Sequence, residues 1–209
     1  MKTLGVIFLL LSSVLAGCIS ETQEFIDEET PSSSPPERMS FTAPLMSNYS
    51  NNTDLILEEY VSEGPVLLIW VAAGCMGCHS WTDIISDEVN NGNISNTSLL
   101  SIHRYPSFES VSYVEEVYGN HENATNPVSW PLVLPPEDTP VIDLESRLES
   151  PVSFYDSFGY PSTPTLQIMD TFGKIIWTSK TYWPTPEVLE EIKNICLLYT
   201  SDAADDTLC

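Results

Sequence analysis

Basic residues are scarce in this sequence. It has 7 Lys and Arg against 30 Asp and Glu over 209 residues, so its formal net charge is −23. A surface of this charge repels phosphate groups, which argues against nucleic acid or an anionic lipid surface as a partner. We therefore expect no nucleic-acid binding.

Long apolar runs are also few, and none after the first residues is long enough to cross a membrane. Residues 1–17 have an early positive charge at Lys2, an apolar run and then small residues before Cys18. This is the layout of a secretory signal. Its ending, "LAGC", resembles the lipobox of bacterial-type lipoproteins, which implies cleavage before Cys18 and lipid on its sulfur. The alternative is an ordinary cleaved signal and a chance cysteine. Either way, we expect the mature chain outside the cytoplasm. The resemblance to a lipobox implies that it is anchored to the membrane there by lipid on Cys18.

The segments next to both ends lack the pattern of a folded core. Residues 18–40 are acidic and rich in Ser and Pro, which predicts a solvated tether. Residues 196–209, "CLLYTSDAADDTLC", lose the helical periodicity that precedes them and resemble a translated sequencing adapter. We predict that they are a non-native tail; the alternative is a genuine acidic tail. Residues 41–195 are long enough for one domain with a substantial core.

Cysteine is scarce too, with five in the chain. Removing both ends leaves Cys75 and Cys78 as the only thiol pair. In "AAGCMGCHSW", residues 72–81, this pair and His79 can be interpreted in two ways. C-x-x-C-H is the attachment signature of a c-type haem, whereas C-x-x-C is that of a dithiol redox centre. A structural zinc site needs four protein ligands, so two cysteines are too few.

The residues around the pair favour the dithiol. Residues 66–71 form a short apolar run after Gly64-Pro65, which predicts a strand buried on both faces of a parallel sheet. A helical stripe follows, formed by Trp81, Ile84, Ile85 and Val89. Cys75 is thus expected at a helix start, where free N–H groups and the helix dipole stabilise a thiolate. Cys75 is the candidate nucleophile and Cys78, one turn later, the resolving thiol. We expect no cofactor other than a redox-active Cys75–Cys78 disulfide.

Three stretches resemble thioredoxin-like proteins, most closely the TlpA-like membrane-anchored group: residues 41–71, "GCMGC", and "FGYPSTPTLQIMDTFGKIIW" at residues 158–177. The resemblance implies an α/β thioredoxin-like fold, with a central mixed sheet flanked by helices, an N-terminal hairpin and an insert before the strand after Pro164. It implies a thiol-disulfide oxidoreductase whose partners are protein thiols and disulfides. Thr163 and Pro164 would form the substrate-facing loop, with a cis bond between them. The direction, reduction or oxidation, stays open.

The sequence also departs from that family. Gly74 stands where the family usually has Trp, and Ile69 stands where thioredoxins often carry a buried acid. Proton transfer from Cys78 then needs another base or water, and His79 and Glu88 are candidates by proximity in sequence. The insert between Cys78 and Pro164 contains a predicted strand near residues 99–106 and a predicted helix near residues 110–119.

Two metal-binding alternatives use the same motif. A c-type haem would take His79 as one axial ligand and a distal Met or His as the other, but small cytochromes of this kind are mostly helical. Some thioredoxin-fold lipoproteins bind copper through two cysteines and a distant histidine. His103 or His121 could supply that third ligand, and thiolates suit Cu(I). Those proteins generally separate their cysteines by three residues, so a copper-binding chaperone or assembly protein is the alternative function.

Overall fold

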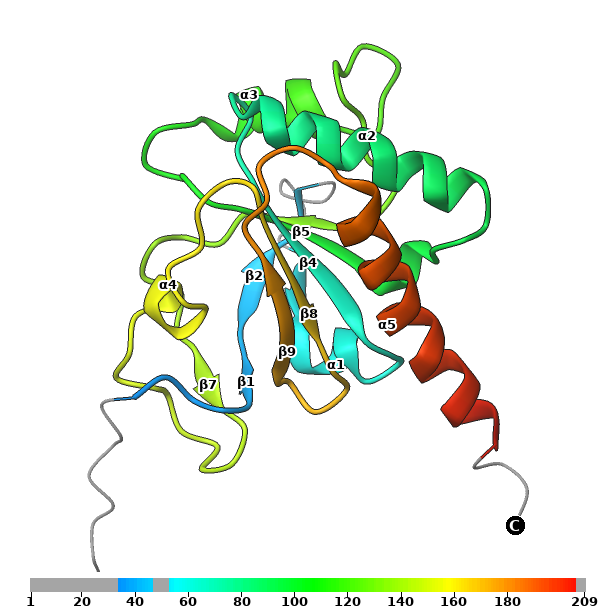
Figure 1. Ribbon diagram of the computed structural model, residues 1–209. Helices are drawn as coiled ribbons and strands as arrows, with labels where there is room; N and C mark the ends of the chain where they lie inside the picture. Colours follow the sequence, from blue (N-terminus) through cyan, green and yellow to red (C-terminus); the bar gives the residue numbers. More distant parts are fainter. Residues whose placement is uncertain (1–33, 47–52, 206–209) are drawn as a thin grey trace, which may run out of the picture. The chain divides into compact units, whose positions relative to one another are not determined.

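The structure, a computed structural model, describes residues 34–46 and 53–205 (Figure 1). The predicted signal peptide, the lipidation site Cys18 and most of the predicted tether lie outside the described residues. Within the described part, no helix combines the length and apolarity that crossing a membrane requires.

The helices and strands of this part follow one another as β1 (Met39–Ser40), β2 (Thr42–Pro44), β3 (Asp54–Ile56), α1 (Leu57–Val61), β4 (Val66–Val71), α2 (Met76–Asn90), the 3-10 helix η2 (Asn96–Ser98), β5 (Leu99–His103), α3 (Val111–Tyr118), β6 (Leu132–Val133), β7 (Ile142–Asp143), α4 (Phe154–Ser157), β8 (Thr165–Met169), β9 (Ile175–Ser179) and α5 (Pro186–Asp205).

A five-stranded mixed sheet organises the domain, in the order β6-β5-β4-β8-β9. Strand β4 pairs with β5 in parallel and with β8 in antiparallel orientation, so it is the central strand. All six of its residues are buried, as the apolar run predicted. The parallel sheet expected around β4 is therefore present on one side only. The expected hairpin is formed by β2 and β3, which pair antiparallel ahead of α1.

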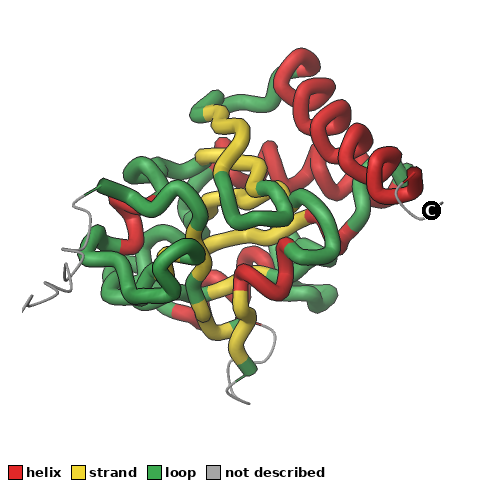
Figure 2. Tube along the Cα trace, turned by 90° about the horizontal axis from the view of Figure 1, so that it is seen from below, coloured by secondary structure: helices red, strands yellow, loops and turns green. Residues whose placement is uncertain are grey.

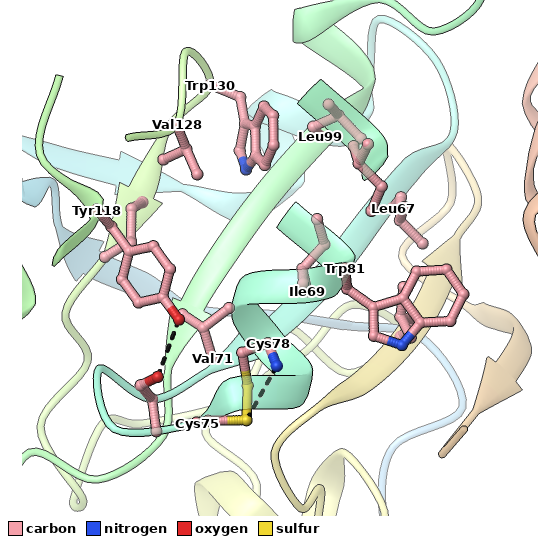
Figure 3. Packing of buried hydrophobic residues seen from close by; sticks show 14 of the residues in the cluster. Leu67, Ile69, Val71, Cys75, Cys78, Trp81, Leu99, Tyr118, Val128 and Trp130 are labelled. Carbon is pink, nitrogen blue, oxygen red and sulfur yellow. Dashed lines mark hydrogen bonds between the residues drawn. A yellow bond between two sulfur atoms is a disulfide. The ribbon is translucent and has the colours of Figure 1, made fainter. Parts of the chain in front are cut away.

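The two faces of the sheet pack against different helices. On one face, Leu67, Ile69 and Val71 form a cluster with Trp81 of α2 and Tyr118 of α3 (Figure 3). Ile192 of α5 belongs to the same cluster. On the other face, alternate residues of β4 contact α1, α4 and Phe41. Because successive side chains of a strand point to opposite faces, one fully apolar strand serves both clusters.

The folded part begins slightly earlier than the predicted boundary at residue 41. Met39 and Ser40, placed in the predicted tether, form β1 and pair with β7. The Met39 N–H also donates to Gly173 O at 2.8 Å, and its side chain is buried. The buried side chain of Met39, at the end of a polar stretch, thus places both Met39 and Ser40 in the folded domain.

Loops and turns make up a large share of the described chain (Figure 2). The segment between α3 and β8 has only the short elements β6, β7 and α4. The strand and helix predicted in the insert are confirmed as β5 and α3. Helix α3 begins after Ser110, whose hydroxyl accepts the Tyr113 N–H. The closing helix α5 begins at Pro186, after Thr185, and continues through Asp205. It does not stop at residue 195, and the non-native tail stays a prediction.

Candidate active site

The two cysteines lie where β4 leads into α2, as predicted. Cys75 is the residue before the first helical position, and Cys78 lies in the first turn. Their Cα atoms are 5.2 Å apart and their sulfurs form a disulfide (Figure 3). The Cys78 N–H points at Cys75 Sγ, with 3.1 Å between nitrogen and sulfur. A free helix N–H directed at this sulfur stabilises negative charge on it once the disulfide is reduced.

The two sulfurs differ in their surroundings. Cys75 is 8 % exposed and Cys78 is fully buried at 0 %, so Cys75 is the cysteine that solvent reaches. Cys78 Sγ lies 3.9 Å from the carbonyl oxygen of Trp70. The disulfide has no sulfur-bound proton, but the reduced Cys78 thiol can donate to this carbonyl. A buried thiol next to an acceptor favours the protonated form.

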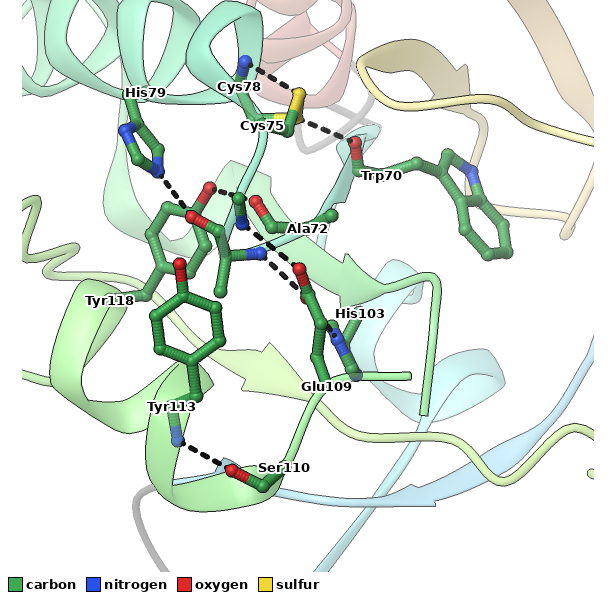
Figure 4. A network of polar contacts seen from close by, with 12 residues as sticks. Trp70, Ala72, Cys75, Cys78, His79, His103, Glu109, Ser110, Tyr113 and Tyr118 are labelled. Carbon is green, nitrogen blue, oxygen red and sulfur yellow. Dashed lines mark hydrogen bonds and ion pairs between the residues drawn. A yellow bond between two sulfur atoms is a disulfide. The ribbon is translucent and has the colours of Figure 1, made fainter. Parts of the chain in front are cut away.

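Side chains from elsewhere bind the backbone between β4 and Cys75 (Figure 4). The carboxylate of Glu109 accepts the N–H of Ala73 at 2.7 Å and that of Gly74 at 3.0 Å. On the other side of the loop, the Tyr118 hydroxyl donates to Ala72 O at 2.9 Å. These bonds fix the three residues that precede Cys75.

Glu109 has a second partner, the buried His103. The distance between His103 Nε2 and Glu109 Oε2 is 2.9 Å. Burial lowers the pKa of His103, and the charge of Glu109 opposes this without cancelling it, so His103 is neutral near pH 7 and donates through Nε2–H. Burial would raise the pKa of Glu109, but the N–H groups of Ala73, Gly74 and His103 together hold it below its ordinary value. A carboxylate charge therefore lies at the loop that carries Cys75.

Neither base proposed from sequence proximity faces the sulfurs in this arrangement. The ring of His79 binds Ala73 O through Nε2 at 2.8 Å and packs against Tyr118. Glu88 follows Cys78 by ten residues of one helix, about 15 Å along its axis, and pairs with Lys193. Sequence reasoning missed Glu109 instead. The position of Glu109 in the chain could have indicated it. Glu109 follows β5, which runs parallel to β4, and the carboxyl ends of parallel strands lie at the same edge of a sheet.

The Thr163-Pro164 segment lies at the same end of the sheet. The bond between these residues is cis, as expected. Thr165, the next residue, begins β8 and pairs with Trp70, one residue before the end of β4. Pro164 is buried and Thr163 half-buried. The structure thus brings both to the β4 end that leads to Cys75.

The residues invoked for copper or haem have other partners. His103 binds Glu109, and His121 Nε2 lies 3.1 Å from Glu115 O, at a cavity of about 280 Å³ beyond α3. Across residues 34–46 and 53–205, no three His, Cys, Asp or Glu side chains are grouped closely enough to hold a metal ion.

Comparison with known proteins identifies the fold. No family model matches the sequence, and no curated protein matches it. The thioredoxin domain of a thiol-disulfide oxidoreductase from Bacteroides vulgatus superposes with a TM-score of 0.51 at 15% identity, over 80% of this chain and 98% of that one. The peroxidoxin BcpB from Mycobacterium tuberculosis gives 0.51 at 14% identity, over 79% and 96%. The chain therefore has a thioredoxin-like α/β fold; identity this low shows the fold and not the chemistry.

Proposed function

We propose that this protein is a thiol-disulfide oxidoreductase that acts on the cysteines of partner proteins outside the cytoplasm, tethered to the membrane by lipid on Cys18. The observation that carries the proposal is the asymmetric pair at the start of α2. Cys75 keeps a small exposed area of 8 % and receives a helix N–H, whereas Cys78, one turn later, is fully buried. This is the arrangement that a dithiol enzyme needs. The lipobox-like "LAGC" supports the anchor.

In the reducing direction, the Cys75 thiolate attacks one sulfur of a partner disulfide. A bond forms between Cys75 and that sulfur, and the other partner sulfur leaves as a thiolate, which takes up a proton. The Cys78 thiol then loses its proton and attacks Cys75 Sγ. The Cys75–Cys78 disulfide forms, the second partner thiolate is released, and two electrons have moved to the partner. Oxidation of a partner dithiol is the same sequence in reverse.

The surrounding residues have distinct roles in this scheme. The Cys78 N–H stabilises the Cys75 thiolate. Glu109 and Tyr118 hold the loop so that Cys75 stays at the helix start. Thr163 and Pro164 offer the backbone beside which the partner segment lies during the mixed disulfide. Glu109 is a positioning residue, since it acts through the backbone of Ala73 and Gly74.

Trapping variants test the proposal. Cys78→Ser should accumulate a mixed disulfide with partner proteins, because attack proceeds and resolution cannot. Cys75→Ser is the matched control and should accumulate little, because its remaining thiol is buried. In the reduced protein, Cys75 should be alkylated first, with a pKa below the value of about 8.5 of a free thiol. Absence of mixed disulfides in both variants, with ordinary titration of Cys75, would overturn the oxidoreductase function.

A further inference from the structure

Arg104 is a buried cation without a counter-ion among the residues that the structure describes. Its side chain is 7 % exposed, and it directly follows the carboxyl end of β5. Arg147, Lys174 and Lys193 each pair with a glutamate. Arg38 and Lys180 have no ion pair among the described residues, but neither is buried. Buried charges are normally paired, because desolvation disfavours them otherwise, so an unpaired guanidinium in so acidic a chain requires an explanation.

Aromatic rings and one carbonyl hold this guanidinium in place. It lies 3.6 Å from the ring centre of Tyr155, with Tyr105 and Tyr160 at 5.0 and 5.3 Å. Its Nε–H donates to Pro161 O at 2.9 Å, three residues before Pro164. The rings stabilise the cation by cation–π attraction but satisfy none of its N–H groups.

The donors at the other end of the guanidinium have no anionic acceptor. Within residues 34–46 and 53–205, Arg104 forms no ion pair, and a side-chain hydrogen bond with the Tyr155 oxygen is the one polar side-chain contact of its terminal nitrogens. Glu137 is close enough for its charge to raise the pKa of Tyr155, but it forms no ion pair with Arg104. A planar fork of N–H donors matches the two oxygens of a carboxylate.

An independent observation points to the same ligand. The Tyr155 hydroxyl is buried and donates no hydrogen bond in the described part of the chain. Burial raises the pKa of Tyr155, so this group is a neutral phenol. Arg104 has no acceptor atom and cannot take the phenol proton. The Tyr155 proton therefore has no acceptor and the adjacent guanidinium has no carboxylate, beside the loop that we propose contacts the partner.

We propose that Arg104 and Tyr155 bind a carboxylate of the partner polypeptide, so that the enzyme prefers target cysteines with an acidic group a few residues away. This inference rests on the proposed oxidoreductase function and adds a substrate class to it. The carboxylate accepts N–H from Arg104 while the partner segment lies along Thr163 and Pro164. The Tyr155 hydroxyl, which is buried in the free protein, donates to the same carboxylate after its side chain turns toward it. The acidic group is the side chain of Asp or Glu, or the carboxyl terminus of the partner.

The test is the rate of disulfide exchange between the full chain and a set of peptides. Each peptide has one cysteine in a mixed disulfide, capped ends, and a single Glu placed in turn at the three positions on either side; its partner peptide has Gln at the same place. A second series has an uncapped carboxyl terminus, which separates the two carboxylate sources. For at least one position in either series, the acidic peptide should react about tenfold faster than its neutral partner. This is the ratio expected when one charge-assisted hydrogen bond stabilises the complex with the acidic peptide.

Variants test whether Arg104 and Tyr155 cause the ratio between the exchange rates of the acidic and the neutral peptide. Arg104→Gln should bring it close to one, and Tyr155→Phe, which keeps the ring, should lower it roughly threefold. Tyr113→Phe is the matched control, since Tyr113 is exposed on α3 and its ring does not contact Arg104, and it should keep the wild-type ratio. If Arg104→Gln does not fold, Tyr155→Phe decides the question.

The outcomes separate the two proposals. Exchange with every peptide at equal acidic and neutral rates overturns the carboxylate site and leaves the oxidoreductase function intact. A preference that persists in both site variants also overturns the site. No exchange with any peptide overturns the proposed function itself.

Discussion

His103 and Glu109 are joined by a hydrogen bond of 2.9 Å, and the same carboxylate binds the backbone of the loop that carries Cys75. His103 is the last residue of β5 and Glu109 precedes the N-cap of α3. The pair therefore links a neighbouring strand to the residues before Cys75. This coupling has consequences for the chemistry of Cys75 and for stability at low pH.

Glu109→Gln should lower the pKa of Cys75 in the reduced protein by roughly half a unit to one unit, because it removes a nearby negative charge and keeps the side-chain shape. The reduction potential should become more oxidising, since the reduced form is stabilised. The pH dependence of Cys75 alkylation measures the first effect, and equilibration with glutathione measures the second. Glu116→Gln, exposed on α3, is the control. An unchanged or raised Cys75 pKa would contradict the assignment.

Acid should weaken the fold through the same pair. His103 and Glu109 both have folded-state pKa values below their ordinary values of 6.5 and 4.5, so the unfolded chain binds more protons than the folded one. Their stabilisation is complete above pH 6.5. It is lost as pH falls, first through His103 and then, below 4.5, through Glu109.

Urea unfolding of the oxidised protein between pH 4 and 8 checks this. Wild type should exceed Glu109→Gln by about 1–3 kcal/mol at pH 7, the cost of leaving buried donors unpaired. The difference should shrink toward the acid end. Taking the difference between wild type and Glu109→Gln cancels the pH dependence that the other carboxylates of the chain contribute to both. A difference independent of pH would exclude Glu109 as the titrating group.

The sequence was sufficient to predict the elements but not their contacts. Strand β4, helix α2 and Cys75 at the helix start followed from the apolar run and the helical stripe, which are local patterns. Glu109 could not be found in this way, because it meets Gly74 only after β5 pairs with β4. Arg104 likewise gains significance only when its burial beside Pro161 is known. The residues that could not be identified from the sequence are those whose role depends on contacts between distant parts of the chain.

Gly77→Ala tests the packing over the start of α2. A Cβ at Gly77 would lie 2.6 Å from Tyr182 O and 2.9 Å from the Tyr182 ring. The oxygen belongs to the backbone, so no side-chain rotation relieves this contact. The loop before α5 must then shift, and it also accepts the Trp81 N–H through Thr181 O. We expect a loss of about 1–3 kcal/mol in the free energy of unfolding.

Gly64→Ala is the matched control, because nothing lies within 4 Å of its added Cβ. It should be neutral or slightly stabilising, since alanine restricts the unfolded chain. Urea unfolding measures both variants. Equal stability of the two would show that the loop before α5 is not packed on Gly77.

Cys18→Ser tests the membrane anchor. The intact protein, produced in a bacterium that processes lipoproteins, should partition into the detergent phase. The variant should lose that behaviour, because the sulfur that accepts the lipid is gone. Full membrane association of the variant would reject lipidation at Cys18.

Ending the chain after Ile195 tests the predicted foreign tail. The packing of α5 on the sheet that the structure describes comes from Val188, Leu189, Ile192 and Ile195. The truncated protein should therefore unfold at the same urea concentration as the full chain. A loss of several kcal/mol would show that residues 196–209 belong to the domain.

The loop clamp has a consequence for exchanging parts between proteins of this fold. Glu109 and Tyr118, which hold Ala72, Ala73 and Gly74, both belong to the insert between Cys78 and Pro164. A chimera in which a shorter connection replaced this insert would keep both cysteines and lose the groups that satisfy the peptide bonds before them. The insert and the C-x-x-C motif therefore form one transferable unit, and grafting either alone should yield an active-site loop with unprotected, rapidly exchanging amides at Ala73 and Gly74.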